Sequence, residues 1–148
     1  MKILSIRERM VNIGSPASNA AISFNSMTAS AVVVEIETCK GRFKGLGFSS
    51  IGRYGHGGLL RERFIPRLLN ANCSLGDLRD CDAGTMAHIW QLLMANEKEG
   101  GHGERSGAVG VLETALWDAF AKSEDLPLWA LLHREFGQST DHGCTNDR

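Results

Sequence analysis

The first fifty residues alternate between apolar and polar side chains, as β-strands do. In residues 3–13 the alternation divides the side chains between two faces, with Leu4, Ile6 and Met10 opposite Ser5, Arg7 and Arg9. Residues 27–38 contain a β-branched run, and residues 43–49 form its partner after a turn. The pattern predicts a three-stranded antiparallel meander. The connection at residues 14–26 is too long for a tight hairpin, and loops of this length in compact domains tend to carry function.

After residue 58 the apolar period lengthens from two to about 3.6 residues, which marks a change from strands to helices. The first helix is expected to bury Leu60, Phe64 and Leu68 on one face. Pro66 should kink or end this helix near Ile65, because proline removes a backbone donor and clashes with the preceding turn.

Further helices are predicted downstream. Thr85 is expected to cap one whose apolar stripe comprises Met86, Ile89, Trp90, Leu93 and Met94. The longest should run over residues 106–123 and bury Val109, Leu112, Leu116, Ala119 and Phe120. Pro127 then favours a short helix over residues 128–133, and residues 136–148 are expected to be an irregular tail.

Together these elements predict an α+β domain, a three-stranded antiparallel meander followed by a helical cluster packed on one side of the sheet. Residues 74–79 should form at most a short helical turn. Three polar or glycine-rich loops, near Asn19, Arg53 and Lys98, are expected to meet at one edge of this domain.

Composition narrows the classes of function. The chain has 148 residues, enough for one domain with a substantial core, and a net charge of −1 that gives no general attraction for nucleic acid or anionic membranes. A cytoplasmic protein is expected, because no apolar run is long enough to span a membrane and the first residues do not resemble a signal peptide. The cysteines lack Cys-x-x-Cys spacing, which favours buried or incidental thiols over a metal site or disulfide framework.

The stretch at residues 49–58 has four glycines within seven residues, followed directly by a predicted helix. Glycines allow close approach of the backbone, while Arg53, Tyr54 and His56 offer charge and hydrogen bonds. Because the first N–H groups of a helix are unpaired, such a loop favours a carboxylate or phosphate ligand. The alternative is a plain strand-to-helix connection with an exposed arginine and histidine.

Residues 96–105 form a second candidate recognition loop. Lys98 can reach toward a carboxylate as a point charge, or it can simply form a solvated pair with a neighbouring glutamate. The glutamates of this loop are poor candidates for Mg²⁺, which needs rigidly held oxygen ligands that a glycine-rich loop does not supply. Asp118 is expected to accept a hydrogen bond from a neighbouring segment. No nucleophile paired with a base is evident.

The order of elements and two sets of motifs resemble a known family. Ala-Leu-Trp-Asp at residues 115–118, followed by Leu-Pro at residues 126–127, is similar to the N-terminal capping domain of the enolase superfamily, in its mandelate racemase and muconate lactonizing branch. Residues 52–64 and 96–106 resemble the D-tartrate dehydratase subgroup more narrowly. The similarity covers residues 3–135.

The resemblance implies that the catalytic residues and the substrate-selecting loops lie in two different domains. In that family a (β/α) barrel, typically of about 200 residues or more, supplies the Mg²⁺ ligands and the lysine and histidine bases, while loops of the cap close over the barrel mouth and select the substrate. Asn19 and Lys98 match family positions expected to touch substrate, and Arg53, Tyr54 and His56 accompany them. Ile51 stands where those relatives carry an asparagine, which argues against tartrate itself as the substrate.

The expected function is therefore that of a substrate-specificity cap of a Mg²⁺-dependent hydroxy-acid or sugar-acid dehydratase. Residues 136–148 do not continue as a barrel strand, so the chain alone is expected to bind no metal and to be inactive. Completed by a barrel, it would take a small carboxylate substrate. Two alternatives stay open: a stand-alone binding or self-association module, and a truncated product without function.

Overall fold

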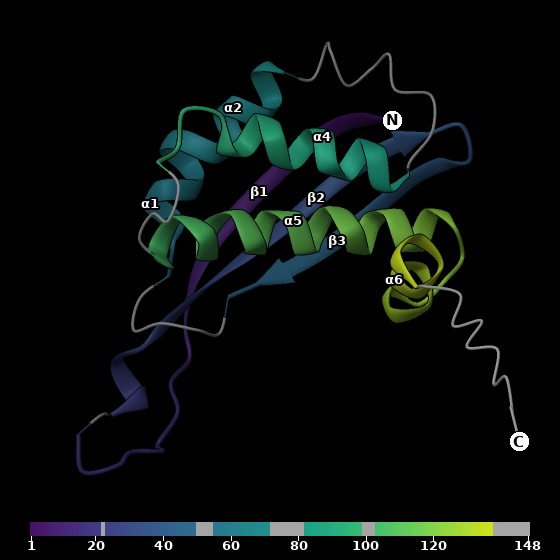
Figure 1. The fold of residues 1–148 in the computed structure, drawn as a ribbon. Helices are drawn as coiled ribbons and strands as arrows, with labels where there is room; N and C mark the ends of the chain where they lie inside the picture. Colours follow the sequence, from purple (N-terminus) through teal and green to yellow (C-terminus); the bar gives the residue numbers. More distant parts are fainter. Residues whose placement is uncertain (22, 50–54, 72–81, 99–102, 138–148) are drawn as a thin grey trace, which may run out of the picture.

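The computed structural model describes residues 1–21, 23–49, 55–71, 82–98 and 103–137. Its strands β1 (Lys2–Asn12), β2 (Thr28–Thr38) and β3 (Gly41–Phe48) form an antiparallel sheet in that order. The elements that follow pack on one face of the sheet (Figure 1): α1 (Gly57–Leu59), η2 (Leu60–Phe64), α2 (Ile65–Asn70), α4 (Ala83–Met94), α5 (Gly103–Ser123) and α6 (Leu128–Phe136). The predicted α+β fold, a meander followed by a helical cluster, is confirmed.

Strand β1 departs from simple alternation near its start. Its register against β2 shifts between Ile3 and Ser5, so Ile3 lies opposite Ile36 and is only 2% exposed. The helix-facing set therefore begins at Ile3 and not at Leu4, as alternation predicted, because an extra residue in one strand shifts the parity of the positions around it. Beyond the shift Glu8 lies opposite the buried Val32, on the face that packs against the helices.

Small residues make the contact between β3 and α5. A Cβ atom added to Gly45 would lie 1.8 Å from the carbonyl oxygen of Ala115, and one on Gly47 would lie 2.2 Å from that of Val111. The helix backbone therefore rests directly on the strand backbone. The predicted apolar stripe of this helix is confirmed, since Val109, Leu112, Leu116, Ala119 and Phe120 are all buried. The helix begins at Gly103, one turn before the expected start.

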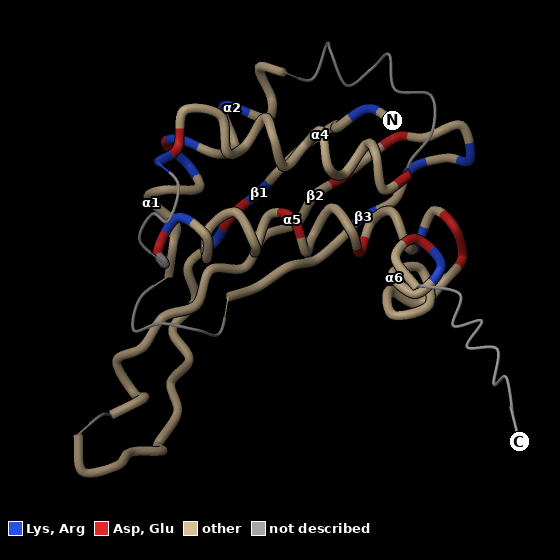
Figure 2. The backbone as a smooth tube through the Cα atoms, in the orientation of Figure 1, with Lys and Arg blue, Asp and Glu red and all other residues tan. Residues whose placement is uncertain are grey.

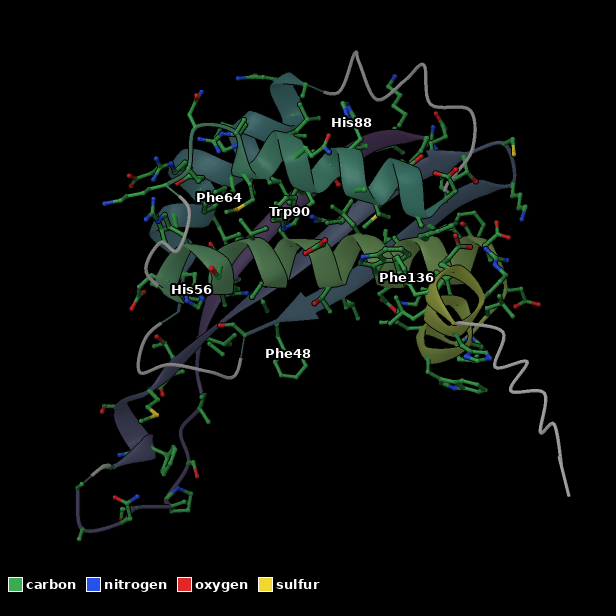
Figure 3. All side chains as sticks on the ribbon, in the orientation of Figure 1. Phe48, His56, Phe64, His88, Trp90 and Phe136 are labelled. Carbon is green, nitrogen blue, oxygen red and sulfur yellow. The ribbon has the colours of Figure 1, made fainter. Side chains whose placement is uncertain are left out.

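The opposite face of β3 carries large apolar side chains in contact with solvent. Leu46 is 59% exposed and Phe48 is 70% exposed, and Figure 3 shows Phe48 pointing away from the helices. They lie opposite Val33 and Ala31 of β2, so the apolar surface continues onto the neighbouring strand.

Pro66 does not end the first helix. The segment η2 is a π-helix that passes directly into α2, where Pro66 occupies the first turn. A proline inside a regular α-helix loses one hydrogen bond and clashes with the carbonyl four residues earlier, and the wider π-turn relieves that clash. Of the two predicted outcomes, a kink or an end near Ile65, the helix does not end there, and its geometry changes from π to α instead. The predicted burial is confirmed for Leu60, Phe64 and Leu68.

The cap of α4 is Asp82 and not Thr85. The Asp82 carboxylate accepts a hydrogen bond from the Thr85 N–H at 2.7 Å, and this bond holds the pKa of Asp82 below its usual value. Both residue types can cap a helix, and the earlier one does so here because Thr85 is itself buried in the first turn. Met86, Ile89 and Leu93 are buried as predicted, but Trp90 is 47% exposed at the edge of the stripe.

The last helix, α6, extends to Phe136, three residues past the predicted end. The Phe136 ring packs edge-on against Trp117 of α5, with ring centroids 5.7 Å apart, so the predicted tail begins in helix. The remaining tail residues, 138–148, and the predicted short turn at residues 74–79 lie outside the described residues.

Asp118 accepts the predicted hydrogen bond, from the Leu46 N–H at 2.8 Å.

Candidate functional site

One end of the sheet gathers the ends of several elements. Here β1 ends, β2 begins and β3 ends, and α1 and α5 begin nearby (Figure 1). The Gly55 N–H donates to the Thr28 hydroxyl at 2.8 Å, which ties the end of the glycine-rich stretch to the start of β2. A Cβ atom on Gly55 would lie 2.9 Å from the Ser30 hydroxyl, so this close approach of the backbone requires glycine.

His56 joins three elements at this end of the sheet. The residue is 7% exposed, and its Nδ1 lies 3.2 Å from the hydroxyl of Ser49, which follows β3. Its Nε2 faces Gly107 in α5, where an added Cβ atom would lie 2.7 Å from that nitrogen. The small residue at position 107 thus makes room for the imidazole, which lies beside the start of α5 in Figure 3.

A pocket of about 260 Å³ opens beside this histidine. It is lined by Phe48, Ser49, His56, Gly107, Gly110, Val111 and Thr114. The Thr114 hydroxyl is used within its own helix, because it donates to the Gly110 carbonyl at 2.7 Å. Ser49 and His56 are within hydrogen-bond distance, but none of the described carboxylates contacts the imidazole to orient it as a catalytic base.

Glu97, between α4 and α5, is held by three arginines. Its side chain is 1% exposed; Oε1 lies 3.0 Å from Arg63 Nε and 3.1 Å from Arg67 Nη1, and Oε2 lies 3.0 Å from Arg105 Nη1. The Arg105 contact is aligned as a hydrogen bond, whereas the two contacts at Oε1 are close ion pairs without that alignment. The expectation that this loop holds nothing rigidly is therefore wrong at Glu97.

Two opposing effects set the pKa of Glu97. Burial raises it, but the hydrogen bond from Arg105 and the nearby charges of Arg67 and Arg63 outweigh burial and leave the pKa below its usual value. The carboxylate is covered by the arginine side chains and not by depth in the core, since the Arg63 side chain is itself 43% exposed. The glutamate is consequently ionised at neutral pH.

The predicted site residues are distributed unevenly. Lys98 is exposed and directly follows the anchored Glu97. Asn19 lies in the β1–β2 connection, which extends beyond the end of the sheet (Figure 1), and its side chain accepts a hydrogen bond from the Ala21 N–H at 2.9 Å. Arg53 and Tyr54 lie outside the described residues. Of the three that the structure describes, His56 is the one whose contacts link separate elements.

Sequence reasoning missed two buried carboxylates, Glu8 and the anchored Glu97. The Glu8 side chain has 0% exposure and accepts hydrogen bonds from Arg61 and, at 3.4 Å, from the Ser30 hydroxyl. The sequence contained a signal for Glu8: it lies two residues after Ile6, so the two side chains share the face of β1 that packs against the helices. For Glu97 the signal was the four-residue spacing of Arg63 and Arg67, which places both on one helix face.

No family model matches the chain. Within the described ranges, no group of three His, Cys, Asp or Glu side chains lies close enough together to hold a metal ion. The helices described here are also too short or too polar to cross a membrane. Figure 2 shows Lys, Arg, Asp and Glu interspersed over η2 and the start of α5.

Proposed function

We propose that residues 1–135 form a specificity cap that closes over the (β/α) barrel of a hydroxy-acid or sugar-acid dehydratase. Residues 52–64 and 96–106 support this through their resemblance to D-tartrate dehydratases of the enolase superfamily. The structural observation that carries the proposal is the His56 junction, where an imidazole links the glycine-rich stretch to the start of α5. A cap needs its recognition loops on a common rim, and this junction holds the glycine-rich stretch against the helix that follows the second loop.

Each loop has a role in this proposal. Lys98 supplies a positive charge for a substrate carboxylate, and Glu97 fixes the backbone next to it. Asn19 and His56 supply hydrogen bonds, with Arg53 and Tyr54 proposed on the same rim. The cap contributes binding and exclusion of water, and the barrel contributes the chemistry.

The Mg²⁺ that this reaction needs does not fit the described residues, which contain no suitable group of ligands. We place it on the barrel, where it would stabilise the charge that develops when a proton next to a carboxylate is removed. The cap residues named above act on the substrate and not on the metal.

A fusion of residues 1–135 to the barrel of a D-tartrate dehydratase relative tests the proposal. We expect turnover of at least one hydroxy diacid or sugar acid. Lys98→Met in the fusion should raise KM roughly tenfold or more, because a charge-assisted contact with the substrate is lost. Lys44→Met, an exposed lysine on β3, is the matched control and should leave KM unchanged. A folded fusion that turns over none of these acids would refute the cap assignment.

The exposed apolar side chains favour a second candidate function, self-association. Leu46 and Phe48 on β3 and Trp129 on α6 are 59%, 70% and 73% exposed. Exposed apolar clusters commonly mark interfaces between proteins. Analytical ultracentrifugation should then detect a dimer that Phe48→Ser weakens, whereas a monomer at all concentrations would leave the barrel as the partner of this surface.

A further inference from the structure

The arginines around Glu97 carry more positive charge than the described residues neutralise. Three guanidinium groups, from Arg63, Arg67 and Arg105, contact one carboxylate. Within the described ranges, no second carboxylate lies at ion-pair distance from any of them; Glu62 and Glu104, on the same helices, are exposed. Counting the described residues alone, the cluster therefore has three positive charges and one negative charge, in a chain whose net charge is −1.

Many of the donors in this cluster have no acceptor among the described residues. A guanidinium group has five N–H donors. Arg105 donates to Glu97 through Nη1, Arg63 approaches Glu97 through Nε, and Arg67 Nη1 also donates to the Leu93 carbonyl. The described residues provide no other acceptor for Arg63 or Arg105. Arg67 is thus fixed in place, while the other two retain donors for a ligand.

The surroundings of the cluster favour the binding of an anion. The side chains of Arg67 and Arg105 are 25% and 19% exposed, so repulsion between them is screened less than it would be in water. Arg105 also lies in the first turn of α5, where the N-terminal amides add positive potential. Arg63, at 43% exposed, leaves one side of the cluster open to solvent.

We propose that this cluster binds an oxyanion, either a carboxylate or a phosphate group, through Arg63 and Arg105. Glu97 keeps the arginines in position, and Arg67 completes the cluster. Planar guanidinium groups suit such ligands because each can donate to two oxygens at once. This site uses residues other than Lys98, which the proposed cap assigns to its substrate, and binding to it does not require a barrel.

Isothermal titration of the full chain with inorganic phosphate and, separately, with malonate tests the site at constant ionic strength. We expect binding of at least one probe, with the tighter probe indicating whether phosphate or carboxylate is preferred. Arg63→Gln should raise Kd roughly tenfold or more, since Arg67 and Arg105 still hold Glu97 and the variant should stay folded. Lys44→Gln on β3 is the control and should bind as the wild type does.

The test separates a ligand site from a purely structural cluster. If neither probe binds, or if Arg63→Gln and Lys44→Gln weaken binding equally, the proposal is overturned. Should circular dichroism show Arg63→Gln to be unfolded, Arg63→Lys replaces it, because lysine keeps the charge but loses the two-oxygen geometry. Weaker binding in Arg63→Lys supports the site, and unchanged binding contradicts it.

Discussion

Helix α5 is attached to the rest of the molecule in two different ways. Along its middle, its backbone rests on Gly45 and Gly47 of β3 with no side chains between them. At its first turns the attachment is polar: Arg105 binds Glu97, and Gly107 lies against His56. The packed middle requires glycines, which have no side chain, whereas the polar end depends on ion pairs and an imidazole.

The difference separates folding from recognition. Direct backbone packing leaves no room for change, because any added atom must displace the helix. The polar end tolerates change more readily, since its arginines are partly exposed and can be satisfied by water or by a ligand. A binding function is therefore easier to place at the start of α5 than along its middle.

The largest expected effect is at the packed middle. Gly45→Ala should lower the free energy of unfolding by about 3 kcal/mol or more, because the new methyl group would meet the Ala115 carbonyl. Urea unfolding monitored by circular dichroism measures it. Gly110→Ala, in the same helix with nothing within 4 Å of the new atom, is the control and should gain about 0.5–1 kcal/mol. Equal stability of the two variants would contradict the packing described for α5.

At the polar end, Glu97→Gln should cost about 2 kcal/mol. Removing one partner from a buried ion pair leaves the other charge unpaired, and the partial exposure of the arginines reduces that penalty. Urea unfolding at pH 7 measures this loss. Glu104→Gln in the first turn of α5, where the carboxylate is exposed, should change stability by less than about 0.5 kcal/mol.

The Glu97 contribution should also depend on pH. Its folded-state pKa is lowered, so the stabilisation is complete above the ordinary carboxyl value of 4.5 and is lost as the pH falls through the lower folded-state value. The difference in unfolding free energy between wild type and Glu97→Gln should therefore shrink as the pH falls below 4.5. A difference that stayed constant down to complete protonation would show that the ion pairs do not stabilise the fold.

Asp82, which caps the start of α4, belongs to neither attachment of α5. Its replacement should lower the free energy of unfolding by less than Glu97→Gln does. Asp82→Ala should cost about 1 kcal/mol, because the Thr85 N–H loses its acceptor. Asp82→Asn should restore most of the loss, since the asparagine side chain also accepts this hydrogen bond. Thermal unfolding of both variants measures the difference. An equal loss in both would show that the negative charge of Asp82, and not its hydrogen bond to the Thr85 N–H, stabilises α4.

The smallest effect should come from an exposed ion pair. Arg42 and Glu37 lie 3.0 Å apart on the outer face of the sheet, with side chains 66% and 41% exposed. Arg42→Gln should change the unfolding free energy by less than about 0.5 kcal/mol. A loss as large as that of Glu97→Gln would remove the distinction between the covered cluster and ordinary surface pairs.

Periodicity predicted much of the fold. The meander and the buried faces of η2 and α5 follow from local alternation or helical spacing. The errors occurred where a local irregularity changed the pattern, at the register shift after Ile3 and at the π-turn before Pro66. Neither irregularity alters composition, so neither is visible in spacing alone.

The candidate site was predicted only in part. Glycine and charge content drew attention to the loops that contain His56 and Lys98, since such loops favour recognition. The three-arginine environment of Glu97 and the contact between His56 and Gly107 were not predicted, because their partners are far apart in the sequence.

The sequence by itself determined which residues are apolar and at what spacing, and thus most of the buried faces of the helices; on β3 the buried face instead carries Gly45 and Gly47, and Leu46 and Phe48 are exposed. The tertiary structure alone decided which charges meet, because a carboxylate on one loop finds its arginines only after two helices have packed side by side. Local spacing acts within a few residues of the chain, whereas the charge environment of Glu97 is assembled across forty-two residues, from Arg63 to Arg105.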